Sequence, residues 1–93
     1  MPSVVATIHV KEDKVEEAKR FLRQLAADVL AKEAGTKVYL PHQSKGDPRT
    51  FVFYEKYESD EALAIHGKNL AAVGKEFGAL LAGAPEIVYL EEL

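Results

Sequence analysis

The segment Thr50–His66, TFVFYEKYESDEALAIH, constrains the fold more than any other part of the sequence, because an apolar strand pattern changes there into an amphipathic helix pattern. The run of aromatic and β-branched residues up to Glu58 is typical of a strand. Ser59, followed by Asp60 and Glu61, forms a helix start signal, since the serine oxygen can accept from a first-turn amide and acidic residues favour this end of the helix dipole. The sequence therefore predicts a strand followed directly by a helix.

A histidine interrupts the apolar stripe of this helix. His66 occupies the one polar position in a spacing of three and four residues, so we expect its ring to point inward. The apolar members of the stripe are Leu63, Leu70, Val73, Phe77 and Leu80.

The remaining patterns predict three further strands and one more helix. A capping-box variant at Asp13 starts a helix whose apolar stripe runs to Val29 and whose outer face pairs Glu16 with Arg20, and Gly35 is the expected residue after its end. The helix that begins near Asp60 is expected to reach Leu81 and to be weakened by its three glycines. The four strands are predicted over Ser3–Val10, Thr36–Gln43, Thr50–Glu58 and Glu86–Glu92.

The order β-α-β-β-α-β indicates an α+β fold of the ferredoxin-like, split βαβ type, with an antiparallel four-stranded sheet and both helices on one face. We expect one domain over residues 1–93. The strand around Phe53 and Tyr54 is apolar on both faces, although the helices can cover only one of them. We therefore expect a homodimer that packs sheet against sheet, the alternative being a strongly twisted sheet covered by loops.

Composition excludes several classes of function. The chain has no cysteine, which removes disulfides, thiolate catalysis and cysteine metal sites. Its net charge of −3, with acidic and basic residues interleaved, lacks the basic stripe that nucleic acids require. No apolar run approaches the roughly 20 residues of a membrane span, and the start MPSVVATIHV does not resemble a signal peptide. We expect a cytoplasmic protein without nucleic-acid or membrane partners.

The element order and the residues around His66 resemble the antibiotic biosynthesis monooxygenase (ABM) domain family, whose members are dimeric α+β barrels. The family pattern has a glycine before the second strand, an Asp-Pro turn, an aromatic strand ending in Glu-x-Trp, a helix cap, an alanine one turn before a helical histidine, and a later aromatic residue. The matching residues, which span nearly the whole chain, are Gly35, Thr36, Asp47, Pro48, Phe51, Phe53, Glu55, Tyr57 at the tryptophan position, Ser59, Ala62, His66 and Phe77.

Two departures from the family pattern affect the expected function. Tyr57 replaces a tryptophan, and Asn69, Leu70 and Ala71 replace a Ser-x-His segment. Haem-degrading relatives depend on a tryptophan and on a later helical histidine that this chain lacks, so we expect no haem and no other cofactor. The resemblance implies a cofactor-independent monooxygenase that deprotonates a small aromatic, quinol or enol-type molecule, which then reacts directly with dioxygen. The alternatives are a small-ligand binding or regulatory module without turnover and a small-molecule isomerase.

The candidate catalytic residues are His66, Tyr57 and Glu55. Histidine titrates near neutral pH and suits a general base, Tyr57 is a donor to an oxyanion, and Glu55 within an aromatic strand must be paired if it is buried. Alternatively, His66 is a core histidine whose ring nitrogens are satisfied by Glu55 or a tyrosine. The candidate substrate-binding residues are His9, Tyr39, Tyr54, Phe53, Asn69 and Leu70.

We expect no metal site. The three histidines, His9, His42 and His66, belong to three separate elements without a close ligand spacing.

Overall fold

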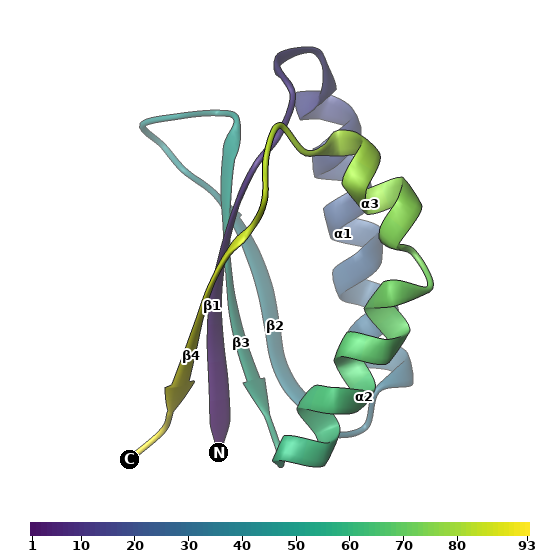
Figure 1. Ribbon diagram of the computed structural model, residues 1–93, viewed down its shortest axis with the longest axis vertical. Coiled ribbons are helices and arrows are strands. Elements are labelled where there is room, and N and C mark those ends of the chain that lie inside the picture. The colour runs from purple at the N-terminus through teal and green to yellow at the C-terminus, as the bar shows by residue number, and fades with distance from the viewer.

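The computed structural model describes all of residues 1–93 as a sheet covered on one face by helices (Figure 1). The chain forms β1 (Pro2–His9), a short 3-10 turn η1 (Glu12–Lys14), α1 (Val15–Lys32), β2 (Thr36–Gln43), β3 (Thr50–Tyr57), α2 (Asp60–Ala71), α3 (Gly74–Leu80) and β4 (Glu86–Glu91). None of these helices combines the length and the apolar composition that a membrane crossing needs.

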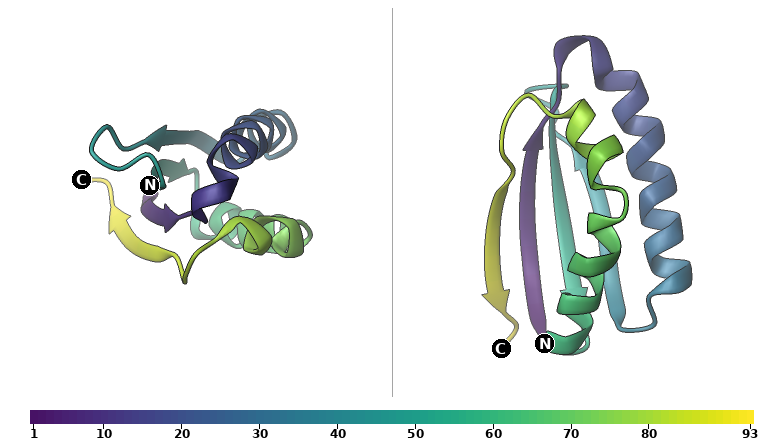
Figure 2. Two further views of the ribbon diagram at one scale, coloured as in Figure 1. Left: turned by 90° about the horizontal axis from the view of Figure 1, so that it is seen from above. Right: turned by 45° about the vertical axis from the view of Figure 1, so that its right-hand side comes forward.

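The sheet has the order β2-β3-β1-β4, and every neighbouring pair is antiparallel. The two halves of the chain thus interleave, with β1 and β3 in the centre. This arrangement confirms the predicted α+β ferredoxin-like fold, with the helices on one side of the sheet (Figure 2).

The helix boundaries differ from the predicted ones in two places. The first helix has no side-chain cap at Asp13, because η1 precedes it and Lys14 occupies the capping position. Its Glu16 pairs with Lys19, at 3.5 Å, rather than with Arg20. The expected helix 60–81 is two helices, since the chain turns at residues 72–73 before α3. The predicted Ser59 cap is confirmed, as its side chain accepts from the Ala62 amide at 3.1 Å.

The inner face of the sheet, which faces the helices, forms the core. Alternate residues of β1 and β3 are buried there, among them Ile8 and Phe53, and they pack against Ala18, Leu22 and Val29 of α1. Burial of such side chains is the main stabilising contribution to the fold.

The outer face of the sheet is not covered by any part of the chain. Leu40 and Val88, on the two edge strands, are 49% and 52% exposed, and Tyr54 between them is 39% exposed. The edge strand β4 contains no buried residue on either face, because the helices do not extend over it (Figure 2). Its inner-face Tyr89 is 71% exposed.

A close contact joins the start of β2 to α2. A Cβ atom added to Gly35 would lie 2.5 Å from the Cβ atom of Ala62, well inside van der Waals contact. Gly35 has no positive φ, so its role is not that of the left-handed residue expected after α1. It is required because only hydrogen fits beside Ala62.

Candidate functional site

A pocket of about 530 Å³ lies between the inner face of the sheet and α2. Its walls are mainly apolar, and its polar side chains are few, as in small-molecule sites in general. The lining residues are Val4, Ala6, Ile8, Tyr39, Phe53, Glu55, Asp60, Leu63, Ala64, His66, Gly67, Leu70, Phe77, Pro85, Ile87 and Tyr89.

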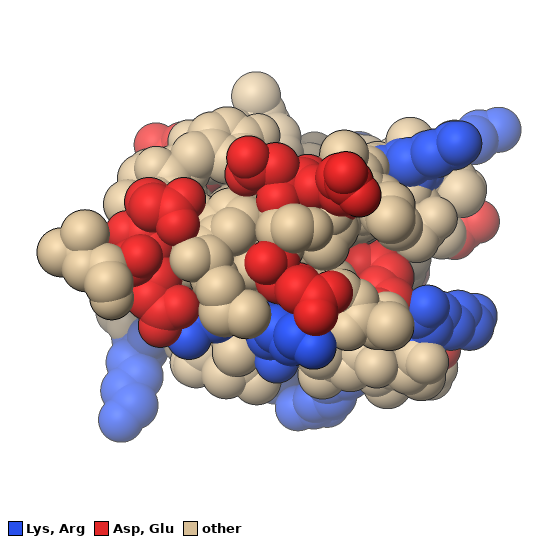
Figure 3. All heavy atoms as spheres, turned by 90° about the horizontal axis from the view of Figure 1, so that it is seen from below, with Lys and Arg blue, Asp and Glu red and all other residues tan.

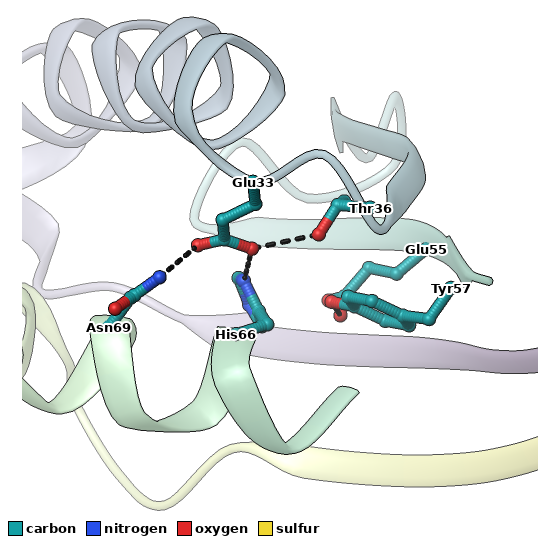
Figure 4. A network of polar contacts seen from close by, with 6 residues as sticks. All are labelled: Glu33, Thr36, Glu55, Tyr57, His66 and Asn69. Carbon is teal, nitrogen blue, oxygen red and sulfur yellow. Dashed lines mark hydrogen bonds and ion pairs between the residues drawn. The ribbon is translucent and has the colours of Figure 1, made fainter. Parts of the chain in front are cut away.

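His66 lines this pocket and is anchored from behind by a carboxylate (Figure 4). Its Nδ1 lies 2.9 Å from Oε1 of Glu33, the residue that ends α1. The same oxygen accepts from the Thr36 hydroxyl at 2.8 Å, and Oε2 accepts from the Asn69 amide at 3.3 Å. The rings of Tyr39 and Tyr57 pack against the imidazole, with centroid distances of 4.9 and 5.4 Å.

This network determines which ring nitrogen of His66 faces the pocket. An ionised carboxylate only accepts hydrogen bonds, so Glu33 places the proton of a neutral imidazole on Nδ1. Nε2 has no hydrogen-bond partner, and no fully enclosed side-chain nitrogen or oxygen lacks one, so Nε2 retains access to the pocket. The result is a fixed ring whose free lone pair is available to a ligand.

Glu55 and Tyr57 form a second polar pair beside the first. The Tyr57 hydroxyl donates to Oε1 of Glu55 at 2.6 Å, and both residues are buried. Burial raises the pKa of the Glu55 carboxyl, although the bond from Tyr57 and, when it is protonated, the charge of His66 oppose the shift. The pKa values of Tyr39 and Tyr57 are raised, chiefly by burial, so both phenols stay protonated at neutral pH. They can donate a proton in a hydrogen bond but cannot act as bases.

The structure brings five of the nine candidate residues to the pocket wall: His66, Glu55, Tyr39, Phe53 and Leu70. Tyr57 lies beneath this wall, fully buried.

The other three candidate residues are placed elsewhere. His9 points to the outer face, where its ring contacts Thr50 and Glu86, and Tyr54 shares that face. Neither can reach the pocket of its own chain, since their neighbours in sequence, Ile8 and Phe53, occupy the inner face. Asn69 is outside the pocket wall, and its amide donates to Glu33, which in turn contacts the rear nitrogen of His66.

Sequence reasoning did not place Glu33 in the site, and it noted Thr36 only as part of the family pattern. The alternative in which His66 is a core histidine gave its ring Glu55 or a tyrosine as partner. In the structure Nδ1 of His66 contacts Glu33, and Glu55 is paired with Tyr57. No group of His, Asp or Glu side chains is arranged to hold a metal ion.

Comparison with known proteins identifies the family. Residues 1–81 match the sequence pattern described as antibiotic biosynthesis monooxygenase. The chain belongs to the antibiotic biosynthesis monooxygenase family. No curated protein matches the chain.

Three solved structures are similar to this chain over nearly its whole length. A proposed antibiotic biosynthesis monooxygenase from Caulobacter crescentus CB15 is 37% identical, with a TM-score of 0.91 over 99% of this chain and 89% of that one. A protein from Pseudomonas aeruginosa is 30% identical, with a TM-score of 0.86 over 99% and 93% of the two chains. A proposed monooxygenase from Nitrosomonas europaea is 25% identical, with a TM-score of 0.91 over 100% and 99%. The family match and the structures from Caulobacter crescentus and Nitrosomonas europaea support a general monooxygenase-like function.

Proposed function

We propose that this ABM protein is a cofactor-independent monooxygenase that oxidises a small aromatic, quinol or enol-type molecule bound beside His66. The observation that carries the proposal is the anchored imidazole, whose Nε2 faces a mainly apolar pocket of about 530 Å³. A general base held in one orientation in a mainly apolar pocket suits the deprotonation of a phenol or enol.

In this reaction Nε2 of His66 takes the proton of the substrate hydroxyl. The resulting anion transfers an electron to dioxygen, the two radicals combine to a peroxide, and loss of water leaves a new carbonyl group. One oxygen atom of dioxygen enters the product and the other leaves as water, a reduction that needs four electrons. Oxidation of an anthrone-type methylene to a carbonyl supplies all four. The proton on His66 returns in the step that forms water.

Glu33 is a positioning residue in this scheme. Its carboxylate lies 2.9 Å from Nδ1 and would stabilise the imidazolium that forms when Nε2 accepts a proton. Glu55, at the pocket wall, and the neutral Tyr39 hydroxyl would bind the polar end of the substrate, while Phe53 and Leu70 would contact its ring.

We also propose that two copies pack through the outer faces of their sheets. Tyr54, Leu40 and Val88 leave this face apolar and exposed, and β4 carries further exposed apolar residues. Monomeric proteins seldom expose a contiguous apolar face of this kind. His9 and Tyr54 would then belong to the dimer interface.

An oxygen electrode tests the reaction with a panel of hydroquinones and anthrones. We expect oxygen uptake above the uncatalysed rate for at least one of them. His66→Ala should abolish this uptake and leave the dimer intact, whereas His42→Ala, which removes an exposed histidine outside the pocket, should leave the rate unchanged. No uptake with any compound, together with ligands that raise the melting temperature, would leave binding without turnover as the function.

A further inference from the structure

We infer that the pocket selects uncharged ligands and rejects those that carry a carboxylate or phosphate. The pocket wall contains no lysine and no arginine, although the chain has 12 such residues. An anion buried there would have no fixed cation to compensate it, and burying an unpaired charge is strongly unfavourable.

The ionisable groups of the pocket are acidic except for His66. Asp60 and Glu55 are its two carboxyl groups, and Asp60 forms no ion pair within the chain. The positive end of the α2 dipole offers no anion site either, because Ser59 already accepts from the first-turn amide of Ala62 and Asp60 and Glu61 lie in the same turn.

The end of the molecule at which α2 begins has the same sign. Seen from below in Figure 3, acidic side chains gather over the middle of this end, while lysine and arginine side chains extend mainly from its margin. Two of the neighbouring cations are also neutralised, because Lys37 pairs with Glu58 at 3.8 Å and Lys56 with Glu92 at 2.8 Å. Arg49 is not part of the pocket wall. An approaching anion therefore meets a repulsive field.

His66 can compensate only one negative charge that forms on a substrate in the pocket. Deprotonation of a neutral substrate by Nε2 creates one anion and one imidazolium, and Glu33 faces that imidazolium from the other side. A substrate that already carries a carboxylate would add a second negative charge near Glu33 and Asp60 with no further cation. This argument from the reaction rests on the proposed function, whereas the preference of the pocket for binding neutral ligands does not.

The test uses two ligands that differ only in charge. Hydroxynaphthamide and hydroxynaphthoate, with the hydroxyl group on one ring and the carbonyl substituent on the other, have nearly the same shape. Isothermal titration calorimetry at neutral pH should give a dissociation constant at least about tenfold lower for the amide, as expected for one unpaired charge in a partly shielded site. Equal or tighter binding of the carboxylate would overturn the inference, and so would the absence of binding by either compound.

A matched pair of variants tests whether the missing cation is the cause. Ala64 lines the pocket and is exposed, so Ala64→Lys places an ammonium group at its opening. Ile65→Lys makes the same change of charge one residue further on, outside the pocket wall. We expect Ala64→Lys to reduce the amide preference several-fold and Ile65→Lys to leave it unchanged. Equal effects of both variants would contradict a local cause.

The two proposals fail in different ways. Tight binding of the amide without oxygen uptake from any hydroquinone would end the monooxygenase proposal and leave the charge selectivity standing. Equal turnover of a hydroquinone and its carboxylated analogue would end the charge selectivity and leave the monooxygenase proposal standing.

Discussion

Replacement of Glu33 is the most direct test of the buried network. Its carboxylate accepts from His66, Thr36 and Asn69, and the first two of these residues are 4% and 6% exposed. Glu33→Ala leaves two buried donors without an acceptor, whereas the exposed Asn69 can turn to water. At about 1–2 kcal/mol for each unsatisfied buried donor, the free energy of unfolding should fall by about 3 kcal/mol.

Glu33→Gln separates the hydrogen bonds from the charge. The glutamine oxygen can still accept from His66 and Thr36, so only the longest bond, to Asn69, and the negative charge are lost. We expect a loss of about 1 kcal/mol in stability but a fall of roughly 10- to 100-fold in kcat/KM, because the negative charge that stabilises the imidazolium is lost while its hydrogen bond remains.

Urea unfolding at equal protein concentration measures these changes, with Glu17→Ala as the control. Glu17 lies on the same helix, α1, in an exposed ion pair with Lys14 at 3.7 Å, so its removal should change stability by about 0.5 kcal/mol or less. At a pH at which the ring is neutral, nitrogen NMR of His66 should show the Nδ1–H tautomer in the native chain and a mixture of tautomers in Glu33→Ala. A Glu33→Ala variant as stable as Glu17→Ala would refute the network, and an unchanged tautomer would refute the anchor.

Three further predictions concern packing, pH and assembly. Gly35→Ala should destabilise the protein by about 1–3 kcal/mol, because the new methyl group overlaps Ala62, and Ala62→Gly should rescue it in urea unfolding of the double variant. Burial raises the pKa of Glu55, so the native state holds its proton more tightly than the unfolded state and stability falls as pH rises from the ordinary value to the raised one. Glu55→Gln keeps an acceptor for Tyr57 and removes this loss, so its stability relative to the native chain should increase from about pH 4 to neutral pH. Val88→Lys, on the exposed outer face, should convert a dimer to a monomer in light scattering, and an unchanged mass would argue against sheet-to-sheet packing.

The order of strands and helices was predictable because it depends on local patterns. The alternation of apolar residues along each strand and the apolar stripe from Leu63 to Leu80 along the helix each indicate which face is buried. Packing these buried faces against one another gives the two layers of the fold. The break between α2 and α3 was less visible, since Gly74 lies within an otherwise helical pattern. Dimerisation and cytoplasmic location stay predictions.

The site was only partly predictable because its key bond joins distant parts of the chain. Glu33 stands in the polar segment AKEAG and looks like a solvated helix end. Only the packing of α2 against the start of β2 brings it to His66, 33 residues later. Side chains alternate along a strand, so His9 and Tyr54 lie on the opposite face of the sheet from their neighbours Ile8 and Phe53. The alternation alone does not tell which of the two faces the helices cover.

The contact between Gly35 and Ala62 indicates which residues of this protein can be substituted without moving His66. It sets the spacing of α2 from the junction that carries Glu33, so the base is positioned by close backbone packing and not by the side chains at the pocket opening. Randomised libraries aimed at new ligands can therefore change Ala64 and Ile87 freely while the proton-accepting ring keeps its place.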